Sequence, residues 1–178
     1  INTCSVTAVA DKKNRAVIRR CRRDNPNAVI GVCGCYTQHA PEDARRLGVD
    51  VIGGSAKREE FIEKMLEAAQ KNAVIARSEA TWQSPGFSGS PLELLDNALS
   101  RREYEVLPAG GLAERTRAML KVQDGCVNFC SYCIIPYTRG PIRSESLEDA
   151  VRQARELEAR GYREIVVTGI EIAGWGRD

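Results

Sequence analysis

Short apolar segments alternate with helical segments near the start of the chain, and this alternation limits the possible folds more than any other feature. Helices are predicted over 8–24, 41–48 and 57–71, and strands over 28–35 and 49–54. Apolar strands that alternate with helices are typical of a parallel sheet with helices on its faces. The first part is therefore predicted to be an α/β domain with a Rossmann-like parallel sheet. The last of these helices has its expected apolar positions at Phe61, Met65, Leu66 and Ala69.

The end of the chain shows the same alternation once more. A strand is predicted over 118–123, a helix over 146–161 and a fully buried parallel strand over 164–170. Ser146 is the expected N-cap of this helix and Gly161 its end, because a serine hydroxyl accepts from the first turn and glycine tolerates the left-handed conformation. These segments form one βαβ unit. The apolar face of its helix is expected at Leu147, Val151, Ala154 and Leu157.

The stretch between these two regions is rich in Ser, Gly and Pro, as in "RSEATWQSPGFSGSP". Such a composition is typical of loops, although a short helix is expected over 92–107. We therefore predict three regions: an N-terminal domain over 1–76, a linker or insertion over 77–112 and a second domain over 113–178. Because the chain begins at Ile1, on residues that resemble the end of a strand, we expect it to be a fragment of a longer protein.

Composition narrows the class of protein. Apolar residues make up 43% of the chain and charged residues 28%, which is ordinary for a globular protein, and the net charge of +2 does not by itself imply a polyanionic partner. No apolar run reaches the roughly 18 residues that a membrane span needs, and no signal peptide is evident. Seven cysteines, an odd number, fit a disulfide framework poorly. Metal binding or redox chemistry in the cytoplasm is therefore expected.

Three of the cysteines, Cys126, Cys130 and Cys133, lie within the loop "DGCVNFCSYCIIPYTRG". Buried structural thiols are one interpretation. A structural zinc site needs four ligands, a thioredoxin-like dithiol leaves Cys126 without a role, and the ferredoxin pattern has another spacing. A four-iron cluster held by only three thiolates is the interpretation that the pattern favours, because one iron then stays free to bind a substrate.

The C-x3-C-x2-C spacing after a strand resembles the signature of radical S-adenosylmethionine (SAM) enzymes. The resemblance implies a partial βα barrel, of which this chain holds the first βαβ unit. It also implies that the free iron chelates the methionine group of SAM, and that one-electron reduction releases a 5′-deoxyadenosyl radical. Tyr132, just before the last cysteine, then occupies the position that lies near the adenine in that family.

Longer segments are similar to the methylthiotransferases, the MiaB, MtaB and RimO group. Residues 115–144 resemble the start of their barrel, and "INTCSVTAVADKKNRAVIRR" and "VCGCYTQ" resemble their N-terminal domain. The resemblance implies a second four-iron cluster with Cys4 and Cys35 as ligands, and a third ligand from an earlier strand and loop. Independently, both cysteines follow the carboxyl ends of predicted parallel strands, where α/β sheets bind ligands. Packing as small hydrophobes is the alternative, and it is favoured for Cys33 and Cys21.

The resemblance implies an enzyme that uses two molecules of SAM, one as methyl donor and one as radical source, with two [4Fe-4S] clusters. "ADKKNRAVIRR", "CIIPYTRGPIRS" and "TGI" favour the MtaB-like branch, which acts on the threonylcarbamoyl-adenosine beside the anticodon of tRNA. MiaB-like action on isopentenyl-adenosine and RimO-like action on a ribosomal-protein aspartate are the alternatives. Implied partners are the tRNA anticodon stem-loop and an electron donor such as flavodoxin or ferredoxin. A non-catalytic iron–sulfur module and a zinc-ribbon-like nucleic-acid-binding module are rivals from other classes.

Several charged residues have two interpretations each. The basic residues of segment 8–24 form either a solvated face or a phosphate-binding face. Arg139 and Arg143 resemble the family's "RG…RS" positions and either orient a carboxylate or a phosphate near the cluster or stabilise the loop. Glu171 stands where the MtaB-like pattern commonly has His, and is either a functional carboxylate or an exposed strand end. His39 is the only histidine, so histidine acid–base catalysis has almost no support.

Overall fold

The computed structural model describes residues 1–5, 7–77, 90–100, 102–106 and 116–178, and for 72–77 it describes the backbone alone. The chain divides into two compact units, Ile1–Asn97 and Ala98–Asp178. Within the described residues, none of the helices combines the length and the apolar character that a bilayer span requires.

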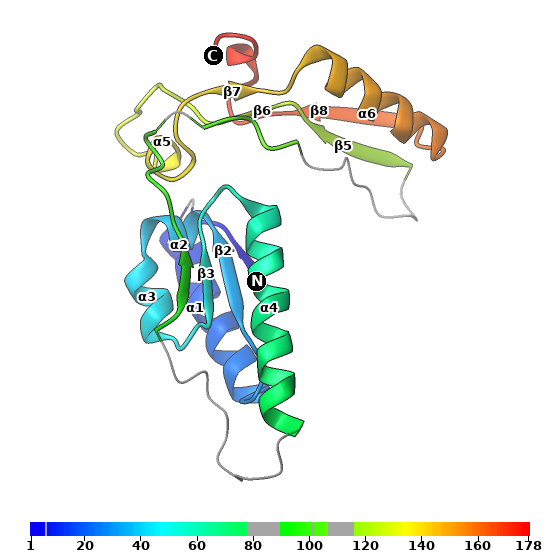
Figure 1. The fold of residues 1–178 in the computed structure, drawn as a ribbon. Helices are drawn as coiled ribbons and strands as arrows, with labels where there is room; N and C mark the ends of the chain where they lie inside the picture. The colour runs from blue at the N-terminus through cyan, green and yellow to red at the C-terminus, as the bar shows by residue number, and fades with distance from the viewer. Residues whose placement is uncertain (6, 78–89, 101, 107–115) are drawn as a thin grey trace. The chain divides into compact units, whose positions relative to one another are not determined.

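The first unit is a four-stranded sheet in the order β1 (Asn2–Thr3), β2 (Gly31–Gly34), β3 (Val51–Gly53) and β4 (Leu92–Leu94), as Figure 1 shows. All neighbouring strands are parallel. The helices are α1 (Ala8–Asp24), α2 (Cys35–His39), α3 (Pro41–Arg46) and α4 (Arg58–Arg77). The predicted α/β fold with a parallel sheet is confirmed. Thr7 is the N-cap of α1, and its Oγ1 accepts from the Ala10 N–H at 3.1 Å.

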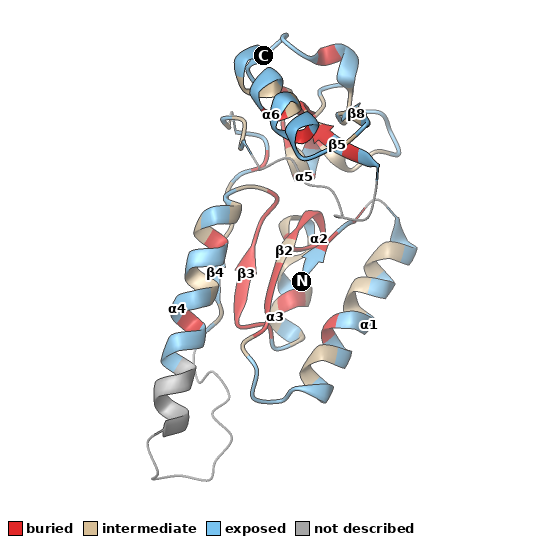
Figure 2. Cartoon of the chain, turned by 90° about the vertical axis from the view of Figure 1, so that its right-hand side faces the viewer, coloured by how far each residue is buried: buried red, intermediate tan, exposed pale blue. Residues whose placement is uncertain are grey.

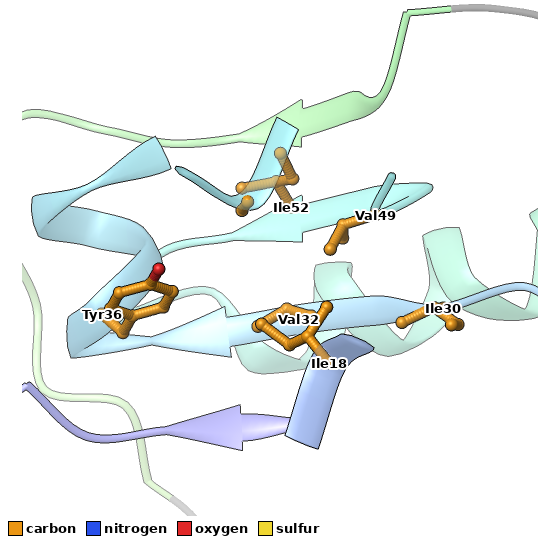
Figure 3. Close-up of a cluster of buried hydrophobic side chains, with 7 residues drawn as sticks. Ile18, Ile30, Val32, Tyr36, Val49 and Ile52 are labelled. Atoms are coloured by element: carbon orange, nitrogen blue, oxygen red, sulfur yellow. The ribbon is translucent and has the colours of Figure 1, made fainter. Parts of the chain in front are cut away.

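One face of this sheet packs against α1, α2 and α3 (Figure 3). Ile18 of α1 is fully buried and lies against apolar residues of β2, β3 and their flanks, namely Ile30, Val32, Tyr36, Val49 and Ile52. Burial of each aliphatic side chain of this kind stabilises the fold by about 1.5–3 kcal/mol. Cys21 packs against this cluster, as expected, whereas its neighbour Val17 is 46% exposed.

The opposite face of the sheet packs against α4. Phe61, Met65 and Ala68 contact a cluster that includes Val51, Cys33 and Leu94. Packing of Cys33, the role favoured for it, agrees with this position. The predicted face of α4 is wrong at Leu66, which is 59% exposed, and at the exposed Ala69, because Ala68 completes the i, i+4, i+7 spacing.

Strand β4 lies inside the range expected to be linker, where the helix predicted over 92–107 is wrong. Leu92 and Leu94 alternate with Glu93, which is the period of a strand, and β4 pairs with β3 in the register Ile52↔Glu93. The described residues 95–100 and 102–106 contain no helix. The loop segment "RSEATWQSPGFSGSP" falls mostly outside the described residues.

The second unit contains two small sheets. Strands β5 (Arg117–Lys121) and β8 (Glu164–Thr168) are parallel, and β6 (Gln123–Asp124) and β7 (Arg143–Ser144) are antiparallel. Its helices are α5 (Ile135–Arg139), α6 (Leu147–Ala159) and the 3₁₀ turn η1 (Ile172–Gly174). Ser146 caps α6 through the Asp149 N–H at 3.1 Å, and Gly161 follows its end with φ of +89°, both as predicted.

Two expectations for this unit are wrong. Strand β8 is not fully buried, since its residues are exposed or half-buried and Val167 is 50% exposed. The apolar face of α6 is only partly covered: Leu157 is fully buried and Ala154 packs beside it, whereas Leu147 and Val151 are exposed. The reason is that β8 pairs only with β5 in the described part of the chain, so one layer of helix covers one side of a narrow sheet (Figure 2).

Candidate functional site

The three-cysteine loop lies between β6 and α5, just beyond the carboxyl end of β5. The Cys126 N–H donates to the Gly140 carbonyl at 3.0 Å, and the Cys133 N–H donates to the Cys130 carbonyl at 2.9 Å. Cys130 is exposed, Cys126 and Cys133 are half-buried, and all three thiols are free. Backbone hydrogen bonds therefore shape this loop while its thiols stay unpaired.

Two glycines fix the ends of the loop. Gly125 has φ of +77°, and a Cβ there would lie 1.9 Å from the Pro141 carbonyl oxygen. Gly140 has φ of +81°, and a Cβ there would lie 1.9 Å from the Ala98 carbonyl oxygen. Both positions require glycine, because an L side chain would be strained and would clash with backbone. The start and the end of the loop are thereby held against neighbouring backbone.

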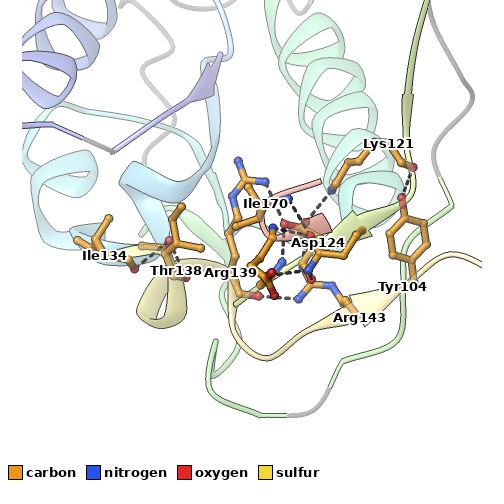
Figure 4. Close-up of polar contacts among 12 residues, drawn as sticks. Tyr104, Lys121, Asp124, Ile134, Thr138, Arg139, Arg143 and Ile170 are labelled. Carbon is orange, nitrogen blue, oxygen red and sulfur yellow. Dashed lines mark hydrogen bonds and ion pairs between the residues drawn. The ribbon is translucent and has the colours of Figure 1, made fainter. Parts of the chain in front are cut away.

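Asp124 is the electrostatic centre of this region (Figure 4). Its carboxylate accepts from Lys121 Nζ at 2.7 Å, Arg139 Nη1 at 3.0 Å and Arg143 Nη2 at 3.1 Å, and from the Gly125 N–H at 2.9 Å. Burial by itself would raise the pKa of Asp124, but the three cations outweigh it and lower the pKa to about 2. The carboxylate is therefore ionised and holds together residues from both sides of the loop.

Gln123 links the loop to the end of β8. Its side chain is fully buried, and its Nε2 donates to the carbonyls of Asp124 at 3.0 Å and Gly125 at 2.8 Å. Its Oε1 accepts from the backbone N–H groups of Ile170 at 2.7 Å and Glu171 at 2.9 Å. All four hydrogen-bonding positions of this amide, two donors and two acceptors, are therefore used.

A second buried polar pair supports β7. Glu145 and Gln153 are 1% and 3% exposed, and Gln153 Nε2 donates to Glu145 Oε1. Burial raises the pKa of Glu145. The Glu145 carbonyl accepts from Trp175 Nε1 at 3.1 Å, which ties β7 to the residues after η1. This pair lies within the second unit and has no described contact with the three thiols.

The predicted cofactor-binding residues and Glu171 lie in three different settings. Arg139 and Arg143 both bind Asp124, and Arg143 Nη1 also donates to the Arg139 carbonyl at 2.6 Å. These contacts support the loop-stabilising interpretation, while contact with a cofactor stays a prediction. Tyr132 is 89% exposed. Glu171 is half-buried and begins η1 at the end of β8.

The first unit holds the other two candidate ligands. Strands β1 and β2 are parallel with Thr3 opposite Gly34, so Cys4 and Cys35 each follow one member of this pair. Their expected position beyond adjacent carboxyl strand ends is confirmed. Cys4 is exposed, whereas Cys35 begins α2 and is 5% exposed. Gly34 has φ of +112°, and a Cβ there would lie 2.3 Å from the Thr3 carbonyl oxygen.

The donor chemistry of these residues fits iron–sulfur binding. Within the described ranges, no three Cys, His, Asp or Glu side chains come close enough together to hold a single metal ion. The loop nevertheless offers three free thiols from one short segment, and thiolates are the donors that iron–sulfur clusters take. Cys4 and Cys35 offer two more thiols at a separate strand edge.

Sequence reasoning singled out all five cysteines, whose role as cluster ligands stays a prediction, but it did not single out Gln123 and Asp124. Both belong to the segment "VQDG", which directly follows β5. Polar residues just past a strand are a signal for site residues in α/β proteins. The sequence does not say, however, that both side chains turn inward and are buried.

Comparison with known proteins gives two matches to families. The radical SAM superfamily matches residues 120–175, and the uncharacterized protein family UPF0004 matches residues 1–54. Together they include all five candidate cysteines.

Individual relatives match the whole chain. A threonylcarbamoyladenosine tRNA methylthiotransferase MtaB from Bacillus subtilis (strain 168) is 41% identical over 100% of this chain and 36% of its own length. The protein of the same name from Aquifex aeolicus (strain VF5) is 34% identical over 100% of this chain and 40% of its own length. A tRNA-2-methylthio-N(6)-dimethylallyladenosine synthase from Carboxydothermus hydrogenoformans is 32% identical over 100% of this chain and 38% of its own length. The chain thus spans well under half the length of these relatives.

Among solved structures, a radical S-adenosylmethionine methyltransferase from Kitasatospora setae is similar with a TM-score of 0.48 and 18% identity. The similarity covers 96% of this chain and 35% of that chain. This likeness is too distant to add to the sequence matches.

Proposed function

This chain belongs to the radical SAM methylthiotransferase family, and on that premise we propose that the protein adds a methylthio group to a tRNA adenosine. The proposed position is C2 of the threonylcarbamoyl-adenosine next to the anticodon. The observation that carries the proposal is the presence of two separate strand-end thiol sites, the loop of Cys126, Cys130 and Cys133 and the pair Cys4 and Cys35.

The choice of substrate follows the relatives. Relatives named for threonylcarbamoyladenosine are 32–41% identical to the chain, and those named for dimethylallyladenosine are 29–33% identical. The first group therefore supports the MtaB-like assignment. MiaB-like action on isopentenyl-adenosine and RimO-like action on a ribosomal-protein aspartate are the competing assignments.

In this proposal Cys126, Cys130 and Cys133 hold a [4Fe-4S] cluster. That cluster would supply an iron for binding SAM and the electron that cleaves the S–C5′ bond of SAM into methionine and a 5′-deoxyadenosyl radical. The chain's own contribution is to hold the loop rigid: Gly125 and Gly140 fix its backbone, and Asp124 fixes its charged surroundings. Tyr132 is proposed to lie beside the adenine of SAM.

The second site is proposed to be an auxiliary [4Fe-4S] cluster with Cys4 and Cys35 as two of its three thiolate ligands. Their neighbouring positions past β1 and β2 support this assignment. Asn14 Nδ2 donates to the Cys4 carbonyl at 2.7 Å, so the backbone of Cys4 is tied to α1. We further propose a cytoplasmic protein that binds the tRNA anticodon stem-loop and takes electrons from a flavodoxin or ferredoxin.

The test uses the complete protein, assembled anaerobically with iron and sulfide, together with SAM, dithionite and tRNA. Mass spectrometry of digested tRNA is expected to show the methylthio form of threonylcarbamoyl-adenosine. Product on isopentenyl-adenosine would instead support the MiaB-like assignment. Cleavage of SAM without any methylthio product on tRNA would overturn the tRNA proposal, and absence of both would favour a non-catalytic iron–sulfur module.

A further inference from the structure

The long helices of the structure differ sharply in charge. Helix α1 has seven basic and two acidic residues, whereas α4 has four of each and α6 has two basic and four acidic residues. Solvent-exposed faces of globular proteins usually mix both signs, as α4 and α6 do. Like charges three and four residues apart also destabilise a helix. The charge of α1 is therefore not that of an ordinary solvated helix.

Two of the seven basic residues of α1 have partners outside the helix. Arg22 Nη2 donates to Asp50 Oδ2 and to the Gly48 carbonyl, both at 2.6 Å, which ties α1 to the residues before β3. Arg15 forms an ion pair with Asp43 at 3.5 Å. These two arginines contribute to the packing of the first unit.

The other five basic residues are exposed and form what we call the basic face: Lys12, Lys13, Arg19, Arg20 and Arg23. Arg20 and Arg23 share one carboxylate, that of Asp24, and their side chains are 76% and 74% exposed. Lys12, Lys13 and Arg19 form no ion pair or hydrogen bond with the described residues. Figure 2 shows that α1 is exposed along its length on the side away from the sheet.

The basic face forms a strip rather than a point. Positions 12, 16, 19, 20 and 23 follow helical spacing, and position 13 lies beside them. Lys12 and Arg23 are eleven residues apart, or about 16 Å along the helix axis at about 1.5 Å per residue. Ala16 lies within the strip, and the exposed Val9 and Val17 lie at its margins. An extended row of cations with few acidic residues fits a polymer with regularly spaced negative charges.

The strip begins beside the Cys4 site. Thr7 is the N-cap of α1, and Asn14 and Asp11 in its first turns bond to the Cys4 carbonyl and to Ser5 Oγ. Lys12 and Lys13 therefore lie within two turns of the residue proposed as an auxiliary-cluster ligand. A polyanion lying along α1 would pass next to that site.

We propose that the basic face of α1 binds the phosphodiester backbone of the substrate RNA and positions it beside the Cys4 and Cys35 site. This inference rests on the proposed tRNA function, which supplies the RNA. Lys and Arg contacts to phosphates fix position without reading bases. The basic face therefore contributes affinity and orientation, and the choice of nucleoside is made elsewhere.

The test compares two triple charge reversals in the complete, cluster-loaded protein. The first variant is K12E/K13E/R19E on the basic face. The matched control is R46E/K71E/R155E, which makes the same change in net charge at exposed basic residues of α3, α4 and α6. Fluorescence anisotropy with a labelled anticodon stem-loop gives the association constant at about 50 to 200 mM salt, a range over which phosphate contacts change affinity strongly.

The basic-face variant is expected to bind RNA at least about tenfold more weakly, with a salt slope smaller by about 2 to 3 than that of the parent. The control is expected to keep the parent slope within about 1. Iron content and SAM cleavage without RNA should be the same in all three proteins, because Lys12, Lys13 and Arg19 touch neither thiol site.

An unchanged salt slope in the K12E/K13E/R19E protein would overturn the inference. The inference would also be overturned if that variant bound RNA normally but was reduced more slowly by flavodoxin. The basic face would then bind an acidic protein. Failure of the proposed function is a separate result: the parent protein would bind the stem-loop but yield no methylthio product.

Discussion

The two thiol sites of the molecule are built in opposite ways. In the second unit all three cysteines come from one short loop, whose shape depends on neighbouring backbone and on the charges around Asp124. In the first unit Cys4 and Cys35 are 31 positions apart in sequence, and only the register of β1 against β2 makes them neighbours. The first kind of site can be recognised in the sequence from the spacing of its cysteines, whereas the second exists only once the strands have paired.

The largest expected effect is that variants of the two thiol sites lose different reactions. Cys126→Ala, Cys130→Ala and Cys133→Ala should each abolish SAM cleavage, because a three-thiolate set has no spare ligand. Cys4→Ala and Cys35→Ala should retain SAM cleavage but abolish methylthiolation. Release of 5′-deoxyadenosine and formation of modified nucleoside are measured on the same samples.

Cys33→Ala is the matched control for these variants, because Cys33 lies next to the strand end but packs under α4. It should retain both activities. If Cys4→Ala also stopped SAM cleavage, the two sites would not be independent, and the comparison would fail.

The next effect concerns Gln123. Gln123→Ala removes four hydrogen bonds, two buried and two partly buried. Each is worth about 1 kcal/mol and their partners are left unpaired, so we expect the free energy of unfolding to fall by about 3–4 kcal/mol. Urea unfolding of the apoprotein measures this loss. Gln153→Ala is a useful comparison, because it removes a buried amide with one described hydrogen bond. An equal or smaller loss for Gln123→Ala would contradict the four-bond role.

A third effect tests the register of the first unit. Gly34→Ala should destabilise that unit by about 2–3 kcal/mol, because its φ of +112° is strained for alanine and the new Cβ meets the Thr3 carbonyl. Gly48→Ala is the control, since Gly48 has φ of +68° and open space around it. Gly48→Ala should lower the free energy of unfolding by about 1 kcal/mol. Similar values for both would show that the contact between β1 and β2 is not tight.

The smallest effect appears as a dependence on pH. Asp124 has a folded pKa of about 2, below its ordinary value of 3.8. A lowered pKa stabilises the fold above the unfolded pKa, and this contribution is lost as pH falls from about 4 towards 2. Its size is about 2 kcal/mol.

Urea unfolding between pH 6 and pH 2 measures this contribution as the difference between the parent and Asp124→Asn. The difference should be largest near neutral pH and should shrink below about pH 4. Glu158→Gln, at an exposed carboxylate of α6, is the control. A constant difference across the range would show that Asp124 acts through shape and not through charge.

Local patterns predicted most of the fold. Helix α1 has a threonine cap, α6 has a serine cap and a glycine stop, and β2 and β3 are short apolar runs. Strand β4 was missed because its three residues follow a Ser-, Gly- and Pro-rich stretch, and only pairing with β3 makes them a strand. The buried state of β8 was overestimated because the sequence does not show how many strands flank it.

The site was predictable where chemistry alone identifies a residue. Cysteine spacing pointed to Cys126, Cys130 and Cys133 without any structure. Arg139 and Arg143 were noticed, but their shared partner Asp124 could not be, because that contact depends on how β6 and β7 pair. Likewise, the sequence shows seven basic residues in α1 but does not say which two of them point inward.

The side chain of Gln123 has a consequence for how the protein can evolve. Only a primary amide of this length offers two donors and two acceptors in these directions, and a glutamate would keep the acceptors but lose both donors. Saturation mutagenesis should therefore find that nearly every substitution at position 123 is rejected. The exposed Tyr132 should instead tolerate aromatic and aliphatic replacements to graded degrees. Sequence differences among relatives would then be expected in the exposed residues of the loop and not at this amide.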